Sequence, residues 1–300
     1  MKLNRIQLQQ FEQNGFLIVE QALTARDLDP VIEEYEVYID QRAHELLSEG
    51  KISQLYDDQP FERRLARICR ENKEIYPELD IMRLRGKASF DFLRNDNLLA
   101  IVEDFVGPEI TCSPIQHMRP KLPTALAADG HPENTHIAPW HQDAGVTWAE
   151  ADGQFILTVW VPFTEATPEN GCLQIIPRIN GSGLKKHQTH PLHGTAIVPD
   201  EMPAAEPLTL PMHKGDMLLM HKETPHRSTP NRSDTVRWSM DLRYQQTGTP
   251  TGRPFHPAFP VRSSVNPDSV LTDHHEWCRR WQAALAESVG VQQHRWEVTA

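Results

Sequence analysis

The spacing of apolar runs between Ile110 and Tyr244 constrains the fold of this chain more than any other feature. Short apolar stretches alternate there with clusters of proline, glycine, asparagine and aspartate. This pattern is typical of antiparallel β-sandwiches and barrels, because each strand is brief and each turn needs residues that tolerate unusual backbone angles. We therefore predict a mainly β core over residues 109–247.

Helical patterns flank this core on both sides. The first part, residues 1–108, is predicted to be mainly helical, with one short strand over Phe16–Val19. Its predicted helices cover Ile6–Gln13, a long stretch from an N-cap at Thr24 to Leu47, Phe61–Cys69 and Leu98–Phe105. The C-terminal extension, 248–300, is predicted to contain a helix over Trp277–Leu285. We expect one elaborated domain over residues 1–300, because β-rich chains of this size often share a single core.

Three segments of the core are considered separately. Ile110–Met118 alternates like one strand, and Gly181–Pro211 has few strand signals. Pro120–Pro139 is predicted to be a long loop, and loops of that length are often lids. With Trp140 and Trp148 it is our candidate lid over a substrate site.

The composition excludes several classes of protein. The chain is 39% hydrophobic and 24% charged, and no apolar run approaches the roughly 18 residues of a membrane span. Its first residues lack the apolar stretch of a signal peptide, so we expect a cytoplasmic protein. The formal net charge of -11 argues against a nucleic-acid surface. A small-molecule substrate is expected, and the sequence leaves monomer and homodimer open.

A candidate metal site begins in Pro139-Trp140-His141-Gln142-Asp143. On an extended strand, two residues that are two positions apart point to the same face, so His141 and Asp143 can share one metal. His226 follows the turn and apolar strand at 214–220 and would supply a third ligand. Two histidines and one carboxylate leave open positions that suit iron(II) oxygenases, whereas zinc more often takes a tetrahedral site.

Arg237 lies on a predicted strand eleven residues after His226. A guanidinium offers a planar fork for a carboxylate, so an arginine inside an apolar core is more easily explained as a ligand clamp than as packing. The Ser228 hydroxyl could donate a hydrogen bond to the same carboxylate.

These residues form His226-x-Ser228-x-x-Asn231-x-Ser233-x-x-x-Arg237, and here the sequence resembles the phytanoyl-CoA dioxygenase family of iron(II)- and 2-oxoglutarate-dependent oxygenases. The resemblance covers most of the chain. It continues, in the family's order, through Phe11–Val19, Phe105–Pro108, Trp140–Asp143 and Thr167–Leu173. One departure lies after Ile176-Pro177, where the family commonly has Gly-Ser-His and this chain has Arg178-Ile179-Asn180.

The resemblance implies a double-stranded β-helix, related to jelly rolls and cupins, with iron(II) on His141, Asp143 and His226. It also implies that the far carboxylate of the co-substrate 2-oxoglutarate binds Arg237 and Ser228. Trp160 and Gln116 fall where the family lines the same pocket.

The implied activity is a dioxygenase reaction that oxidises, and most directly hydroxylates, a C–H bond of a small organic substrate and releases succinate and CO2. Asp143 fills a position that is small in related halogenases, which favours hydroxylation over halogenation. Two alternatives stay open: a cupin-like metal-dependent dioxygenase or isomerase that does not use 2-oxoglutarate, and a non-catalytic binding protein of the same fold. Fold does not fix the substrate, although Arg227 or Arg243 could meet an anionic one.

Overall fold

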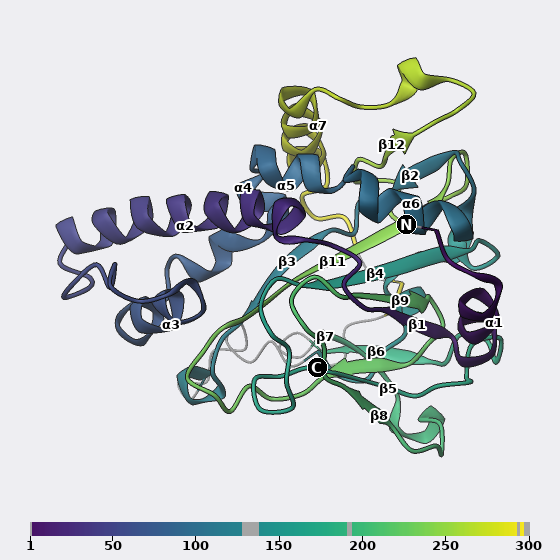
Figure 1. Cartoon of the computed structure of the whole chain (residues 1–300), viewed down its shortest axis with the longest axis horizontal. Helices are drawn as coiled ribbons and strands as arrows, with labels where there is room; N and C mark the ends of the chain where they lie inside the picture. Colours follow the sequence, from purple (N-terminus) through teal and green to yellow (C-terminus); the bar gives the residue numbers. More distant parts are fainter. Residues whose placement is uncertain (1, 128–137, 191–193, 293–294, 297–300) are drawn as a thin grey trace.

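The computed structural model describes residues 2–127, 138–190, 194–292 and 295–296. Helices occupy the two ends of the chain and strands its middle, which confirms the predicted mainly β fold with flanking helices (Figure 1). The helices are α1 (Arg5–Asn14), α2 (Ala25–Ser48), α3 (Phe61–Glu71), α4 (Ile81–Leu84), α5 (Lys87–Phe92), α6 (Asp96–Val106) and α7 (His274–Glu287). None of the helices in the described ranges is long and apolar enough to cross a membrane.

The strands form a large antiparallel sheet and two small ones. The strands are β1 (Phe16–Val19), β2 (Ile110–Cys112), β3 (His117–Lys121), β4 (Ile156–Pro162), β5 (Leu173–Ile175), β6 (His187–His190), β7 (Gly194–Ile197), β8 (Leu208–Leu210), β9 (Met217–His221), β10 (His226–Ser228), β11 (Arg237–Gln246) and β12 (Phe259–Arg262). The large sheet has the order β1-β9-β4-β11-β2-β12, with β3 also paired to β11. A second sheet, β10-β5-β8, lies below it in Figure 1, and β6 pairs with β7.

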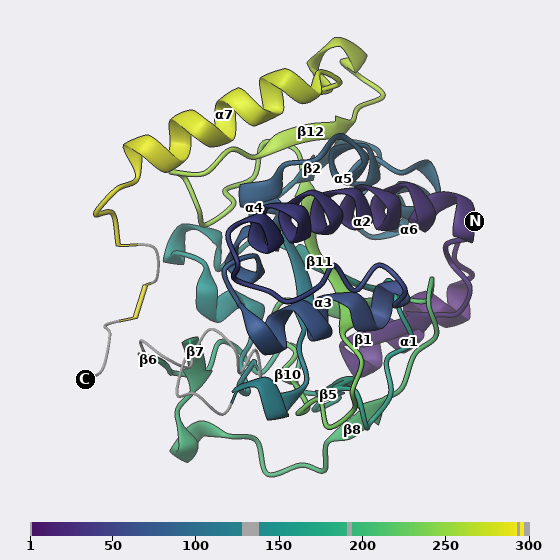
Figure 2. The same cartoon turned by 90° about the vertical axis from the view of Figure 1, so that its left-hand side faces the viewer.

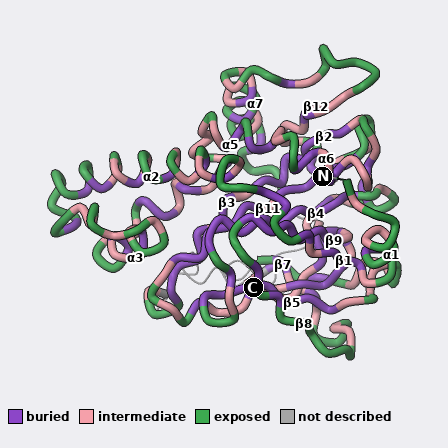
Figure 3. The backbone as a smooth tube through the Cα atoms, viewed as in Figure 1, coloured by how far each residue is buried: buried purple, intermediate pink, exposed green. Residues whose placement is uncertain are grey.

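Alternation along β11 separates a helix-facing side from an interior side. Trp238 packs against Tyr35 of α2, with ring centroids 5.5 Å apart, and stacks on Phe61 of α3 at 4.7 Å. Because neighbouring residues of a strand point to opposite faces, Arg237 and Arg243 point away from these helices into the interior. Figure 2 shows α2 and α3 in front of β11, and Figure 3 shows that the strands of the sheet are mostly buried.

A separate apolar cluster fills the space between the large sheet and the β10-β5-β8 sheet. Trp160 of β4 meets Leu218 of β9 there, together with Leu173 and Ile175 of β5. The two sheets therefore form the two walls of the double-stranded β-helix, and the interior residues of β4 and β11 lie between them. Functional side chains on these strands are held by a packed core.

Several helices and strands were predicted closely from the sequence. Thr24 is the N-cap of α2 and the hydroxyl of its capping box donates to Asp27 at 2.8 Å. The strand over Phe16–Val19 is confirmed with the predicted bounds. The four cysteines are all free thiols, and only Cys278 is half-buried.

Two predictions about the core were wrong, and a third is only partly described. Residues 110–118 are not one strand, because the chain leaves the sheet after Cys112 and returns at His117 to pair on another part of β11. Residues 181–211 contain three short strands, and in two of them, β6 and β7, polar residues such as Thr189 and Thr195 pair with each other and give no apolar alternation. The candidate lid begins with strand residues, and 128–137 lie outside the described residues.

Candidate active site

The backbone brings the two predicted ligand histidines together. His226 begins β10, and His141 lies opposite it as an isolated antiparallel pair. The His141 amide donates to the His226 carbonyl at 3.0 Å, and the His226 amide donates back at 2.9 Å. Side chains of directly opposed residues lie on the same face, and the two ring centroids are 4.2 Å apart.

Asp143 reaches the same face through a turn. We expected an extended strand from His141 to Asp143, but the extended backbone ends at Gln142 and Asp143 begins a 3-10 turn, η4 (Asp143–Val146). The strand ends there because the Gly145 amide folds back to the Gln142 carbonyl at 2.8 Å. With one extended residue between them, the side chains still converge, and His141 Nε2 lies 3.9 Å from Asp143 Oδ1.

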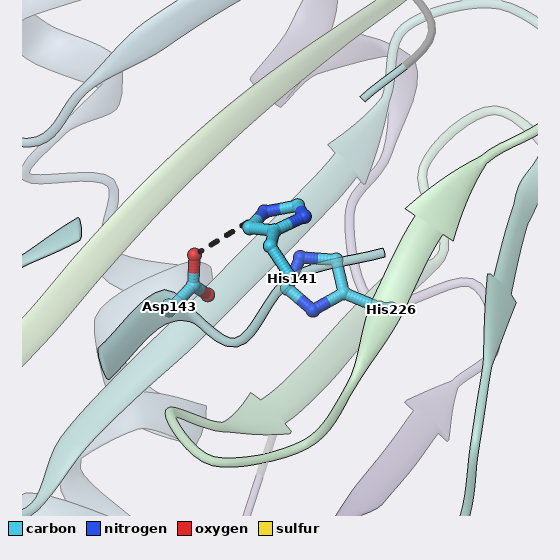
Figure 4. A group of neighbouring side chains, drawn as sticks. All are labelled: His141, Asp143 and His226. Atoms are coloured by element: carbon cyan, nitrogen blue, oxygen red, sulfur yellow. Dashed lines mark ion pairs between the residues drawn. The ribbon is translucent and has the colours of Figure 1, made fainter. Parts of the chain in front are cut away.

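The three side chains point toward one another and offer one ligand atom each within 4.8 Å (Figure 4). His141 Nδ1 lies 2.8 Å from the Pro139 carbonyl, and His226 Nδ1 lies 3.0 Å from the Thr224 carbonyl. A carbonyl only accepts, so each Nδ1 is the protonated donor and each Nε2 keeps its lone pair for a metal. Burial lowers the pKa of His141 to about 4, and His226 adds to this effect, so His141 is in the neutral, metal-binding form at pH 7.

Two buried groups orient the Asp143 carboxylate. Arg243 of β11 forms an ion pair with its Oδ1, and the Thr158 hydroxyl of β4 donates to its Oδ2. Burial alone would raise the pKa of Asp143, but Arg243 and the two histidines outweigh it and hold that pKa well below its usual range. Arg243 also pairs with Asp241 at 3.1 Å. Arg243 thus already pairs with two carboxylates, while its Nε has no hydrogen bond among the described residues, and a contact of Arg243 with an anionic substrate stays a prediction.

Arg237 and Lys121 lie together in the interior toward the other end of β11. Arg237 is 3% exposed, its guanidinium lies 5.2 Å from the Trp160 ring, and its Nε has no hydrogen bond among the residues that the structure describes. Lys121 lies directly opposite in β3 and donates to the Ser228 hydroxyl at 2.7 Å. Burial, with the charge of Arg237, lowers the pKa of Lys121 to about 6. These residues thus have the charge and donors to bind a carboxylate.

Sequence reasoning missed Lys121 and the use of Arg243. The sequence did indicate Arg243, because it lies an even number of residues after Arg237 on one strand and so points to the same face. Lys121 could be found only from the pairing of β3 with β11. Gln116 is fully buried and donates to the Ser113 carbonyl at 2.9 Å, while its Oε1 has no hydrogen bond among the described residues. Its place in the co-substrate pocket stays a prediction.

A cavity borders the candidate metal ligands on the side of Arg243. Its interior is about 10 Å³, which is room for roughly one water molecule. Its walls combine Asp143 and Arg243 with apolar residues such as Ile115 and Ile156. A ligand larger than water would therefore have to move some of these side chains to reach Asp143 from this side.

Comparisons with known proteins agree with this architecture. The family model Phytanoyl-CoA dioxygenase (PhyH) matches residues 11–239. The Danio rerio protein Phytanoyl-CoA dioxygenase domain-containing protein 1 is 32% identical over 103 residues, which are 32% of this chain and 35% of that protein. The matched stretch thus spans about a third of that relative's length.

Two solved structures share the fold. The non-heme monooxygenase ThoJ has a TM-score of 0.63 at 17% identity, covering 95% of this chain and 99% of that one. The epimerase SnoN in complex with Fe3+, alpha ketoglutarate and nogalamycin RO has a TM-score of 0.52 at 17% identity, covering 82% and 86%. The family match over most of the sequence, with this shared fold, shows that the chain belongs to the phytanoyl-CoA dioxygenase family, whose cofactors are iron(II), 2-oxoglutarate and dioxygen.

Proposed function

We propose that this chain is an iron(II)- and 2-oxoglutarate-dependent dioxygenase that hydroxylates a C–H bond of a small organic substrate. His141, Asp143 and His226 would hold the metal. When bound there, iron(II) with 2-oxoglutarate supplies the activation of dioxygen, with release of succinate and CO2. We further propose that the protein acts in the cytoplasm, as a monomer or homodimer, and without a nucleic-acid partner.

The observation that carries this proposal is the buried guanidinium of Arg237. Among the described residues no acid lies within ion-pair distance of it, and burial lowers the pKa of Arg237 only to about 10. It therefore stays charged at pH 7, and a buried charge without a counter-ion is costly. A dianionic co-substrate would supply that counter-ion. A cupin-like enzyme that does not use 2-oxoglutarate has no need of such a clamp.

The residues around the site would bind and orient the reactants. Arg237, Lys121 and Ser228 would fix the far carboxylate, and the Trp160 ring would cover the chain between that carboxylate and the metal. Arg243 and Thr158 hold Asp143 in one rotamer, which fixes the direction of its ligand oxygen. The packed walls would limit the access of water, and the binding and orientation of the reactants are the main contribution of a protein to cofactor chemistry.

The test is an anaerobic titration of iron(II) and then 2-oxoglutarate into metal-free protein, following the weak visible charge-transfer band of the chelate. We expect a band in wild type, none in His226→Ala, and a weakened band with raised half-saturation in Arg237→Ala. His213→Ala is the matched control, since the exposed His213 side chain pairs with Glu165 at the surface. Iron binding without a band at saturating 2-oxoglutarate would favour the cupin-like alternative, and no iron binding would favour a binding protein.

A further inference from the structure

Three consecutive carbonyls after Asp143 are each bound by a residue of the C-terminal extension. The Trp296 indole donates to the Gly145 carbonyl at 2.8 Å, and Arg253 Nε donates to the Val146 carbonyl at 2.9 Å. Arg295 Nε donates to the Thr147 carbonyl. The turn that positions the candidate ligand Asp143 is therefore held from outside the β core.

Arg253 and Arg295 each donate from Nε to a backbone carbonyl, but the partners of their terminal nitrogens differ. The two terminal nitrogens of Arg295 are both paired with the Asp152 carboxylate. Those of Arg253 have no hydrogen bond and no acid within ion-pair distance among the residues that the structure describes. Arg295 is thus a neutralised clamp, whereas Arg253 carries an extra charge.

The position of Arg253 makes that extra charge costly. Arg253 is 7% exposed, and its guanidinium lies 5.8 Å from the Phe255 ring. Burial lowers its pKa to about 10, with a smaller contribution from the nearby charge of Arg243, so Arg253 remains a cation. The neighbouring His256 has a buried Nε2 without a hydrogen-bond partner in the described part of the chain. A single carbonyl does not compensate a buried guanidinium.

The backbone conformation at Gly252 places Arg253 against the turn that follows Asp143. Gly252 has a φ of +69°, and a Cβ there would lie 2.5 Å from the Thr147 Cβ. The Gly252 carbonyl also accepts from the Trp148 amide at 2.9 Å. Only glycine permits this approach, so the chain is pressed against the metal-ligand turn immediately before Arg253. Asp143 and Asp241 are paired with Arg243, and no acid of the described residues forms an ion pair with Arg253.

We propose that Arg253 binds an anionic group, a carboxylate or a phosphate monoester, of the substrate. This inference rests on the proposed function, because it places the substrate beside the metal site. The terminal nitrogens of Arg253 form the charged half of the site, and the rings of Phe255 and Trp148, whose centroids are 5.7 Å apart, form its apolar border. The substrate is then a small organic anion that is distinct from 2-oxoglutarate.

The test uses three probes of one shape: benzoate, phenyl phosphate and benzamide. Manganese(II)-loaded full-length protein with saturating 2-oxoglutarate is titrated with each probe, and paramagnetic broadening of the probe's proton signals reports binding near the metal. We expect at least one anion to bind about tenfold or more tightly than benzamide, as loss of a charge-assisted hydrogen bond implies. Preference for benzoate alone identifies a carboxylate, and preference for phenyl phosphate alone identifies a phosphate.

Variants separate this role from support of the turn. Arg253→Gln keeps a donor for the Val146 carbonyl and should lose the preference for the anion, while Arg253→Lys should retain part of it. Arg295→Gln is the matched control and should bind the probes as wild type does. Unchanged preference in Arg253→Gln, equal binding of all three probes by wild type, or competition of the anion with 2-oxoglutarate would overturn the inference. Absence of the iron(II) chelate band in wild type would instead refute the proposed function.

Discussion

Replacing Arg243 by methionine should strongly lower the stability of the metal-free protein, because Arg243 is the buried partner of two carboxylates. Arg243 and Asp143 have side chains that are 4% and 3% exposed, and Arg243 also pairs with Asp241. Removing one partner of a buried ion pair typically costs about 3–5 kcal/mol, because the other charge stays buried without compensation. At roughly 2 °C per kcal/mol for a chain of this size, the melting temperature of metal-free protein should fall by about 6–10 °C.

A divalent cation on Asp143 should offset part of this loss. The bound metal supplies the positive charge that Arg243 no longer provides, so the stability gap between variant and wild type should narrow when metal is added. The assay is urea or thermal unfolding of both proteins without metal and with saturating manganese(II). The control is Arg262→Met, which removes pairs with Asp96 and Glu103 at the surface and should cost less than about 1 kcal/mol.

Two results would refute this reasoning in different ways. A metal-free Arg243→Met protein within about 1 kcal/mol of wild type would show that Asp143 does not need a buried counter-charge. A large loss that manganese(II) leaves unchanged would show that the metal does not bind at Asp143. Either result would require a different account of why Asp143, Asp241 and Arg243 are buried together.

Two further predictions concern the groups around the cofactors. The pKa of Lys121 falls from about 10.4 in an unfolded chain to about 6 in the fold, so the unfolded chain binds more protons between these pH values. The stability difference between wild type and Lys121→Met should therefore shift in favour of wild type as pH rises from 6 to 10, by at most about 1.4 kcal/mol per pH unit in urea unfolding; a flat difference would contradict the lowered pKa. Thr158→Val removes the hydroxyl that donates to Asp143 at nearly constant volume, and calorimetry should show manganese(II) binding weakened by about tenfold, whereas unchanged affinity would show that this hydrogen bond does not position the carboxylate.

The sequence predicted those parts of the fold that depend on local patterns. The long helix α2 follows from its apolar period and from Thr24, and the short strand before it follows from an apolar run after Asn14-Gly15. The convergence of His141, Asp143 and His226 was also predictable, because residue type and spacing indicate a shared ligand. In each case the information lies within a few neighbouring residues or within a known order of motifs.

The parts that could not be predicted depend on the pairing of distant segments. Arg243 meets Asp143 because β11 pairs with β4 in a register that sets Arg243 opposite Thr158. Lys121 meets Ser228 because β3 pairs with β11 and sets Lys121 opposite Arg237. A shift of one residue in either register would turn these side chains to the helix-facing side, and a single sequence does not state the register.

The same registers limit where substrate specificity can reside. One strand, β11, carries Arg237 toward the proposed co-substrate and Arg243 toward the proposed metal ligand, while its alternate residues pack against the helices. A change on β11 therefore disturbs the core and both sites at once. Arg253 and its neighbours lie beyond β11 and contact the turn after Asp143, Arg253 at the Val146 carbonyl and Gly252 at the Trp148 amide. Because loops tolerate substitutions that a packed strand does not, the C-terminal extension can change the substrate that is bound while the metal and co-substrate sites stay the same.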